Sequence, residues 1–367
     1  MRKGGGSALA QERAHRGPSW VGAASRVTGG GRTVIFMRGA AAALPLVYHP
    51  HYSAAGWPPK HRFPMWKFTD LYRFLSGIGL ATGSNVHRPI EEPPSEWFER
   101  VHDSAYYRSF MAGDLGVAAE RRIGFGDETR RRPLIRRTVL ECAGTVRTVQ
   151  LALDHGLAAH LAGGTHHAHR SFGSGFTILN DLAVAAAWAI ENTAVRKVAV
   201  VDLDVHQGDG TAAIFDASGS DGAPPHRHAN AVFTFSMHCG QNFPFRKARS
   251  DLDVDLPKGT GDAAYLSALR ETLPRILSTH QPDLVLYDAG VDVYAGDQLG
   301  YLALSHAGIY QRDLYVIDEC CRRRIPVACV IGGGYDRDPL ALARRHGLVH
   351  RAAARVWARR RLATRGP

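Results

Sequence analysis

Four short apolar segments, each followed at once by glycines and polar side chains, constrain the fold of this chain most strongly. Helix-like stretches separate them, and strands that alternate with helices are typical of a parallel sheet built from βαβ units. Uninterrupted apolar runs also suit strands that are covered on both faces. The pattern therefore predicts an α/β fold with a mainly parallel central sheet. The four segments are residues 157–161, 198–201, 284–287 and 326–331.

The same pattern continues without a break that would suggest a domain boundary, so we expect one domain over residues 45–350. Residues 1–44 are rich in Gly, Ala and Arg and lack periodicity, which predicts a disordered basic segment. Their composition also suits an organelle targeting peptide, or an overcalled start codon with Met37 as the true start. Residues 351–367 are expected to form a basic C-terminal tail.

The net charge of +11 lies at the two ends of the chain, because residues 1–40 carry +6 and residues 339–367 carry +8. These ends leave contact with nucleic acid open, although solvated termini are the simpler interpretation. The five cysteines include no CxxC pair and predict buried thiols in a reducing compartment, so we expect a cytoplasmic protein. No apolar run approaches the roughly 20 residues that span a bilayer, and no membrane partner is expected.

The segment VDLDVHQGDG places Asp202, Asp204 and His206 at alternate positions after an apolar run. On an extended segment these side chains would point the same way, and such a cluster is costly to bury without a cation. Asp204 and His206 are therefore predicted as ligands of a divalent metal, with Asp292 from a neighbouring strand end as the third. Zinc is the first choice, and the oxygen-rich set also admits iron or cobalt. The alternatives are a solvated acidic loop and, for Asp292, a turn or helix-capping role.

Two histidines in tandem, His166 and His167, follow Gly-Gly-Thr at the end of another predicted strand. A neutral imidazole near pH 7 can take a proton from an attacking water. Each imidazole needs a carboxylate to orient it, and Asp202 and Asp209 are available for that role. Tyr335 follows three glycines, and its phenol is predicted to stabilise a developing oxyanion.

Aromatic side chains in two loops are candidates for the walls of a substrate channel. Phe176 ends the segment Gly-Ser-Gly-Phe, and Phe243 and Phe245 lie in Asn-Phe-Pro-Phe. Two facing rings would enclose an alkyl chain. We expect at least one of Phe243 and Phe245 to pack in the core instead.

Several motifs in the same order resemble the zinc-dependent histone deacetylases and their bacterial relatives, over residues 48–349. The resemblance implies a single-domain, three-layer α/β/α fold of the arginase/deacetylase type, with a deacetylase-like catalytic domain. Residues 62–68 and Gln207 make the chain most similar to the class IV branch and to bacterial proteins. The motifs are HPHY (49–52), RVHDSAYY (100–107), GGTHHA (163–168), GSGFTILND (173–181), VDLDVHQGDG (201–210), GVDVYAGDQLG (290–300) and GGGY (332–335).

The resemblance implies a role for each matching residue. His167 would be the general base and His166 its electrostatic or acid partner, while Tyr335 would bind the oxyanion. Zinc would be held by Asp204, His206 and Asp292, and the histidines oriented by Asp202 and Asp209. The substrate channel would be formed by Gly175, Phe176 and Phe243. A potassium ion would be held, mostly through backbone carbonyls, by Asp202, Asp204, His206, Ser236 and Met237.

One element of the class I pattern has no clear counterpart, namely the acid that holds the substrate backbone; Glu91, Glu92 and Asp103 are the candidates. The expected function is a zinc-dependent amidohydrolase that removes acetyl or longer acyl groups from lysine side chains of proteins. One alternative is a deacetylase of small acylated amines such as acetylpolyamines. Another is a non-catalytic, deacetylase-like scaffold or chromatin-binding partner. A ureohydrolase would need a richer carboxylate set for two manganese ions.

Overall fold

The computed structural model describes residues 43–219, 225–360 and 362, and these residues form one sheet of eight strands in which every adjacent pair is parallel. The strand order is β2-β1-β3-β8-β7-β4-β5-β6. This confirms the predicted α/β fold. In chain order the strands are β1 Leu46–Val47, β2 Val86–His87, β3 Leu157–His160, β4 Val198–Asp202, β5 Val232–Cys239, β6 Leu252–Leu256, β7 Leu284–Asp288 and β8 Val327–Val330.

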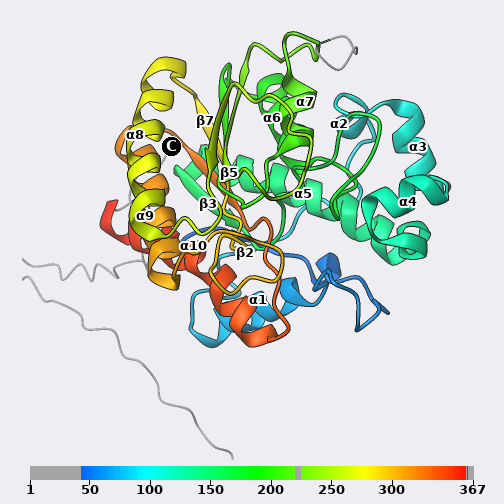
Figure 1. Cartoon of the computed structure of the whole chain (residues 1–367), viewed down its shortest axis with the longest axis horizontal. Helices are drawn as coiled ribbons and strands as arrows, with labels where there is room; N and C mark the ends of the chain where they lie inside the picture. Colours follow the sequence, from blue (N-terminus) through cyan, green and yellow to red (C-terminus); the bar gives the residue numbers. More distant parts are fainter. Residues whose placement is uncertain (1–42, 220–224, 361, 363–367) are drawn as a thin grey trace, which may run out of the picture. The chain divides into compact units, whose positions relative to one another are not determined.

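Helices cover both faces of this sheet, as a three-layer fold requires. Figure 1 shows α8 and α9 on one side of the strands, with α10 packed on α9, and α5 and α6 on the other side. The α-helices are α1 Lys67–Gly77, α2 Glu96–Glu99, α3 Ser104–Ala112, α4 Val117–Ile123, α5 Arg132–His155, α6 Asp181–Asn192, α7 Asp209–Phe215, α8 Asp262–His280, α9 His306–Arg322 and α10 Pro339–Arg360. Short 3-10 turns lie at Pro50–Tyr52 and Gly126–Arg130.

The middle of the sheet is its most deeply buried part. Strands β3, β4, β7 and β8 are buried at every position, because their apolar side chains meet helices on both faces. Local signals set the helix ends beside them. The Asn180 side chain accepts a hydrogen bond from Ala183 N at the start of α6, and Ser305 accepts one from Gly308 N at the start of α9. The polar loops that follow the strands are thereby fixed at one edge of a rigid sheet.

Residues 96–112 form two short helices, α2 and α3, because the chain turns at His102 and Asp103 between them. The His102 imidazole is buried, lies 3.0 Å from His169 O and accepts a hydrogen bond from Asn180 N. These contacts tie the turn to the loop after β3, and they join residues that are too distant in sequence for periodicity to detect.

The C-terminal boundary also differs from the expectation, because α10 runs through residue 350 to Arg360. Val356 and Trp357 are buried, and Arg360 pairs with Asp318 of α9, so the first part of the expected tail belongs to the fold. The expected N-terminal segment falls almost wholly on residues 1–42, outside the described residues. No helix in the described part of the chain is long and apolar enough to cross a membrane. All five cysteines are buried thiols, as predicted.

Candidate active site

The loops that follow β3, β4, β7 and β8 meet at one edge of the sheet, because these strands are parallel neighbours. In the β4–β7 register Asp202 lies opposite Asp288. The loop after β8 continues from there, and Gly332 N donates a hydrogen bond to Gly163 O in the loop after β3. A cavity at this edge is lined by His166, His167, Asp204, His206 and Tyr335, among other residues. The sequence analysis predicted these residues to lie together.

Asp204, His206 and Asp292 form a compact trio of metal-binding side chains. One donor atom from each lies within 4.8 Å of the others, and all three side chains are buried. His206 Nδ1 lies 3.0 Å from Asp204 Oδ1 and 3.2 Å from Asp292 Oδ2. The predicted convergence of these distant residues is therefore present.

The trio fits a divalent cation. Asp292 Oδ2 is buried and makes no hydrogen bond to any described residue, while Gly333 N donates one to Asp204 Oδ2 and Val205 N donates one to Asp292 Oδ1. Burial lowers the pKa of His206, but the carboxylates of Asp204 and Asp292 outweigh it and raise that pKa to about 10. The raised pKa shows that the trio favours a positive charge, as a site that binds a metal cation must. One imidazole with two carboxylates suits zinc, iron or cobalt.

The backbone places Asp202 differently from its neighbours in the motif. β4 ends at Asp202, and the chain then turns, because Asp202 Oδ1 accepts a hydrogen bond from Asp204 N and Asp204 Oδ1 accepts one from His206 N. The expectation that all three side chains point the same way is therefore wrong. Asp202 faces His166, whereas Asp204 and His206 face Asp292.

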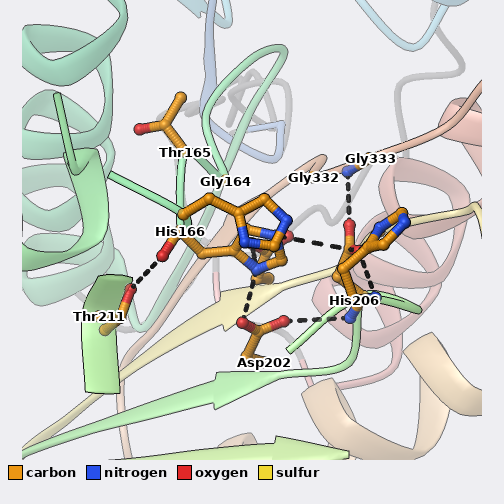
Figure 2. Close-up of polar contacts among 12 residues, drawn as sticks. Gly164, Thr165, His166, Asp202, His206, Thr211, Gly332 and Gly333 are labelled. Atoms are coloured by element: carbon orange, nitrogen blue, oxygen red, sulfur yellow. Dashed lines mark hydrogen bonds and ion pairs between the residues drawn. The ribbon is translucent and has the colours of Figure 1, made fainter. Parts of the chain in front are cut away.

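Three carboxylates lie close to the His166 ring nitrogens, and Figure 2 shows the one of Asp202 beside the imidazole. His166 Nδ1 lies 2.7 Å from Asp202 Oδ2 and 3.8 Å from Asp288 Oδ2, and its Nε2 lies 3.9 Å from Asp204 Oδ1. Burial lowers the pKa of His166, but the negative charges of Asp202, Asp204 and Asp288 outweigh it and raise that pKa well above the usual range. Asp288 was not assigned a role from the sequence. Within the part of the chain that the structure describes, neither of its buried carboxyl oxygens makes a hydrogen bond.

His167 has a different environment. Its Nδ1 lies 2.6 Å from Asp209 Oδ1, and the other oxygen of Asp209 lies 3.1 Å from His169 Nε2. Burial, together with the neighbouring His166 charge, lowers the pKa of His167 to about 4, although Asp209 opposes this. His167 is therefore neutral at pH 7, and Asp209 contacts its Nδ1 and not its Nε2. No role was predicted for His169 from the sequence, although it lies only two residues after the predicted base, His167.

The Tyr335 side chain is buried and lines the same cavity, and its backbone is fixed by Asp297. Tyr335 N donates a hydrogen bond to Asp297 Oδ2 at 2.7 Å, while Leu299 N and Gly300 N donate to Asp297 Oδ1. Burial and the nearby carboxylates of Asp292 and Asp204 raise the pKa of the Tyr335 phenol, so it remains a hydrogen-bond donor. Asp297 was not singled out, although it lies in one of the motifs that carried the resemblance.

Gly175, Phe176 and Phe243 line the mouth above the trio. Gly175 has φ +54°, and a Cβ there would lie 2.5 Å from His167 Cδ2, so only glycine fits. Phe176 also has a positive φ, of 64°, and packs on Phe125 with ring centres 5.6 Å apart. The expectation that Phe243 or Phe245 packs in the core is wrong: Phe245 is 94 % exposed, because its loop projects at the rim of the mouth.

The predicted potassium site involves residues from adjacent strands, since Asp202 lies opposite Ser236 in the β4–β5 register. Met237 follows in β5, and Asp204 and His206 follow β4. The role of these residues in binding potassium stays a prediction.

The lining of the cavity also includes charged side chains that were not predicted from the sequence. Lys67 Nζ donates a hydrogen bond to Gly332 O at 2.9 Å, and Arg137 pairs with Glu141 at 2.6 Å. All three side chains are buried. Burial lowers the pKa of Lys67 to about 8, although carboxylates led by Glu141 oppose this. Their sequence signal is weak, because Lys67 follows a Pro- and aromatic-rich segment at the first position of α1 and the other two lie on the long helix α5.

None of the candidates for a substrate-binding acid lies among the residues that line the mouth. Glu91 contacts His49 and pairs with Arg136, and Asp103 pairs with Arg170. Glu92 is likewise absent from the lining.

Comparison with known proteins assigns the family. Residues 61–349 match the histone deacetylase domain. An uncharacterized protein of Picosynechococcus sp. is 46 % identical over 86 % of this chain and 99 % of its own length. Histone deacetylase 2 of Arabidopsis thaliana is 29 % identical over 79 % of this chain and 74 % of its own length. The crystal structure of an HDAC homolog complexed with SAHA has a TM-score of 0.70 at 23 % identity, covering 85 % of this chain and 84 % of that one, and shows the same fold. The chain belongs to the histone deacetylase domain family, a family of metal-dependent amide hydrolases.

Proposed function

We propose that this protein is a zinc-dependent deacylase that removes the acyl group from the side-chain amine of lysine in proteins or peptides. The observation that carries the proposal is the convergence of four elements on one cavity. These are the trio of Asp204, His206 and Asp292, a neutral imidazole at His167, a charged imidazole at His166 and a phenol at Tyr335. Acyl transfer to water needs these functions.

A divalent metal held by the trio would polarise the acyl carbonyl and lower the pKa of an attacking water. His167 is placed to accept the proton of that water, because Asp209 holds its Nδ1 and leaves Nε2 as the acceptor. The Tyr335 hydroxyl donates a hydrogen bond to the oxyanion that develops on the acyl oxygen. The leaving amine takes a proton from the pair of histidines, of which His166 holds its proton more strongly.

The narrow cavity lined by Asp204 and His206 favours a short acyl group. Its volume is only about 30 Å³, which is room for about two water molecules. The buried charges of Lys67, Arg137 and Glu141 also line it, and apolar methylene groups would remove water from them at a cost. Acetyl is therefore the acyl group that we propose, in preference to long fatty chains.

The test combines metal analysis with an assay on an uncharged fluorogenic acetyl-lysine substrate. We expect about one zinc per chain and hydrolysis that a hydroxamate inhibits. The Tyr335→Phe variant should lose about 10²–10³-fold in kcat, as removal of an oxyanion donor does elsewhere, while it keeps its metal and its Tm. Activity of Tyr335→Phe near the wild-type level would overturn the role of the phenol. A wild-type protein that binds metal but hydrolyses no acyl-lysine substrate would overturn the proposed function and favour a scaffold.

A further inference from the structure

The mouth of the candidate active site is positively charged. It is a cavity of about 370 Å³ above the trio, and its lining includes His167, His206 and Tyr335. Among the described residues, only two that line it carry a permanent charge, and both are arginines, Arg62 before α1 and Arg122 in α4. No aspartate or glutamate of the described ranges lines it.

Neither arginine is neutralised within the protein. Both are exposed, and among the residues that the structure describes neither guanidinium lies within 4 Å of a carboxylate. Arg122 instead lies over the Phe172 ring, 4.7 Å from its centre. Arg62 is close enough to the Tyr335 phenol for its charge to oppose the rise in that pKa. Two free cations therefore flank the entrance to the catalytic groups.

Aromatic rings also line the mouth, and one of them has a third positive charge beside it. Lys258 Nζ lies 4.6 Å from the centre of the Tyr301 ring, and Tyr301 lines the mouth. Phe245, another lining residue, is 94 % exposed. A ligand that crosses the mouth thus meets arginine cations and aromatic rings, one of which has a lysine beside it.

We infer that the mouth selects acyl-lysine in an acidic sequence context, with Arg62 and Arg122 binding aspartate or glutamate side chains next to the modified lysine. The inference rests on the proposed function and names the substrate class of that same site. Guanidinium groups bind carboxylates with charge-assisted hydrogen bonds. An uncompensated cationic rim also attracts anionic ligands and repels cationic ones before contact. An acetylated polyamine, which retains positive charges beyond the amide, is repelled by the same rim, and so is a lysine- and arginine-rich peptide.

The experiment compares two acetyl-lysine peptides that differ only in their neighbours, with glutamate on both sides in one and lysine on both sides in the other. At low ionic strength we expect kcat/KM of the wild-type protein to be at least about tenfold higher for the glutamate peptide, mainly through KM. The ratio should fall toward one in about 0.5 M NaCl, because the charges are exposed and screened. Arg122→Glu should reduce the ratio or reverse it.

Arg121→Glu is the matched control, because Arg121 is the neighbouring exposed residue of α4 and does not line the mouth. The control should keep the wild-type ratio within about twofold, since solvent screens a charge outside the mouth. Equal rates on both peptides, or a preference for the lysine peptide, would overturn the inference and leave the proposed function standing. An Arg121→Glu effect as large as that of Arg122→Glu would also overturn it. Hydrolysis of acetylspermidine but of neither peptide would overturn the proposed function itself.

Discussion

The two adjacent histidines of the site form pairs that look alike and behave in opposite ways. His166 and His167 each place Nδ1 within 2.7 Å of an aspartate, and both are buried. Yet the pKa of His166 is raised well above the usual range, whereas that of His167 is lowered to about 4. A carboxylate partner alone therefore does not decide the charge of a buried imidazole.

The difference lies in what surrounds each pair. Three carboxylates lie within 4 Å of the His166 ring nitrogens, and their combined charge outweighs the cost of burial. His167 has Asp209, which His169 shares, and the His166 ring lies 4.1 Å away, centre to centre. A positive charge on His166 makes a second one on His167 costly. One histidine thus holds a proton while its neighbour is free to accept one.

Removal of the neutral imidazole should give the largest effect. His167→Ala is expected to lower kcat/KM by about 10³-fold, because general-base catalysis contributes roughly 10²–10⁴-fold. His167 does not belong to the metal trio, so metal content should stay at the wild-type level. Steady-state kinetics with metal analysis of the same sample measure both. A loss smaller than tenfold would show that another group accepts the proton.

Removal of the acid behind His167 should cost less. Asp209→Asn keeps the shape of the side chain but replaces the charged acceptor of the His167 Nδ1 proton, and losses of about 10–100-fold are usual for such partners. Asp127→Asn is the control, since that carboxylate is 94 % exposed and does not line the cavity. Both variants should retain the wild-type Tm within about 3 °C. If Asp209→Asn matched the control in activity, Asp209 would not orient the base.

The sequence predicted much of this arrangement, because parallel strands end at a common edge. Asp204 and His206 follow β4 and Asp292 follows β7, and the two strands are neighbours. The tandem histidines and Tyr335 follow β3 and β8, which are also neighbours. Each of these residues stands directly after an apolar run, so its place at the edge follows from chain order and strand direction alone.

Residues that depend on the register between strands were beyond the sequence. Asp288 enters the His166 cluster only because β7 places it opposite Asp202 of β4. Asp181, the first residue of α6, accepts hydrogen bonds from Gly164 N and Thr165 N and so fixes the loop before the histidines. No local pattern indicates these pairings. The opposite pKa shifts of His166 and His167 depend on such placements, and the sequence assigned the two roles only through the family resemblance.

A change in the charge around His166 should appear in the pH profile. Asp202→Asn removes the carboxylate nearest to His166, so the pKa of His166 should fall and the imidazolium should lose its proton at lower pH. We expect the alkaline limb of the kcat/KM profile to move by about one unit toward lower pH, with less change at the acid limb. Profiles of wild type and variant, measured with metal in excess, make the comparison. An unchanged alkaline limb would show that His166 does not carry the proton that this limb reports.

The smallest expected effect concerns Asp288, and it appears in stability. Burial, and then the neighbouring Asp202 charge, raise the pKa of Asp288 well above the usual range. Above about pH 4 the unfolded chain ionises this carboxyl, whereas the native protein ionises it only at higher pH, so wild-type stability falls with pH through this group by up to about 1.4 kcal/mol per pH unit. Asp288→Asn removes that loss. The free energy of unfolding of the variant minus that of wild type should therefore be lowest near pH 4.5 and rise by at least about 1 kcal/mol toward pH 8. Denaturant titrations at both pH values measure this difference in the free energy of unfolding. The ionisation of the metal-binding side chains contributes equally to both proteins and cancels. A difference that stays constant with pH would mean that the pKa of Asp288 is not raised in the folded protein.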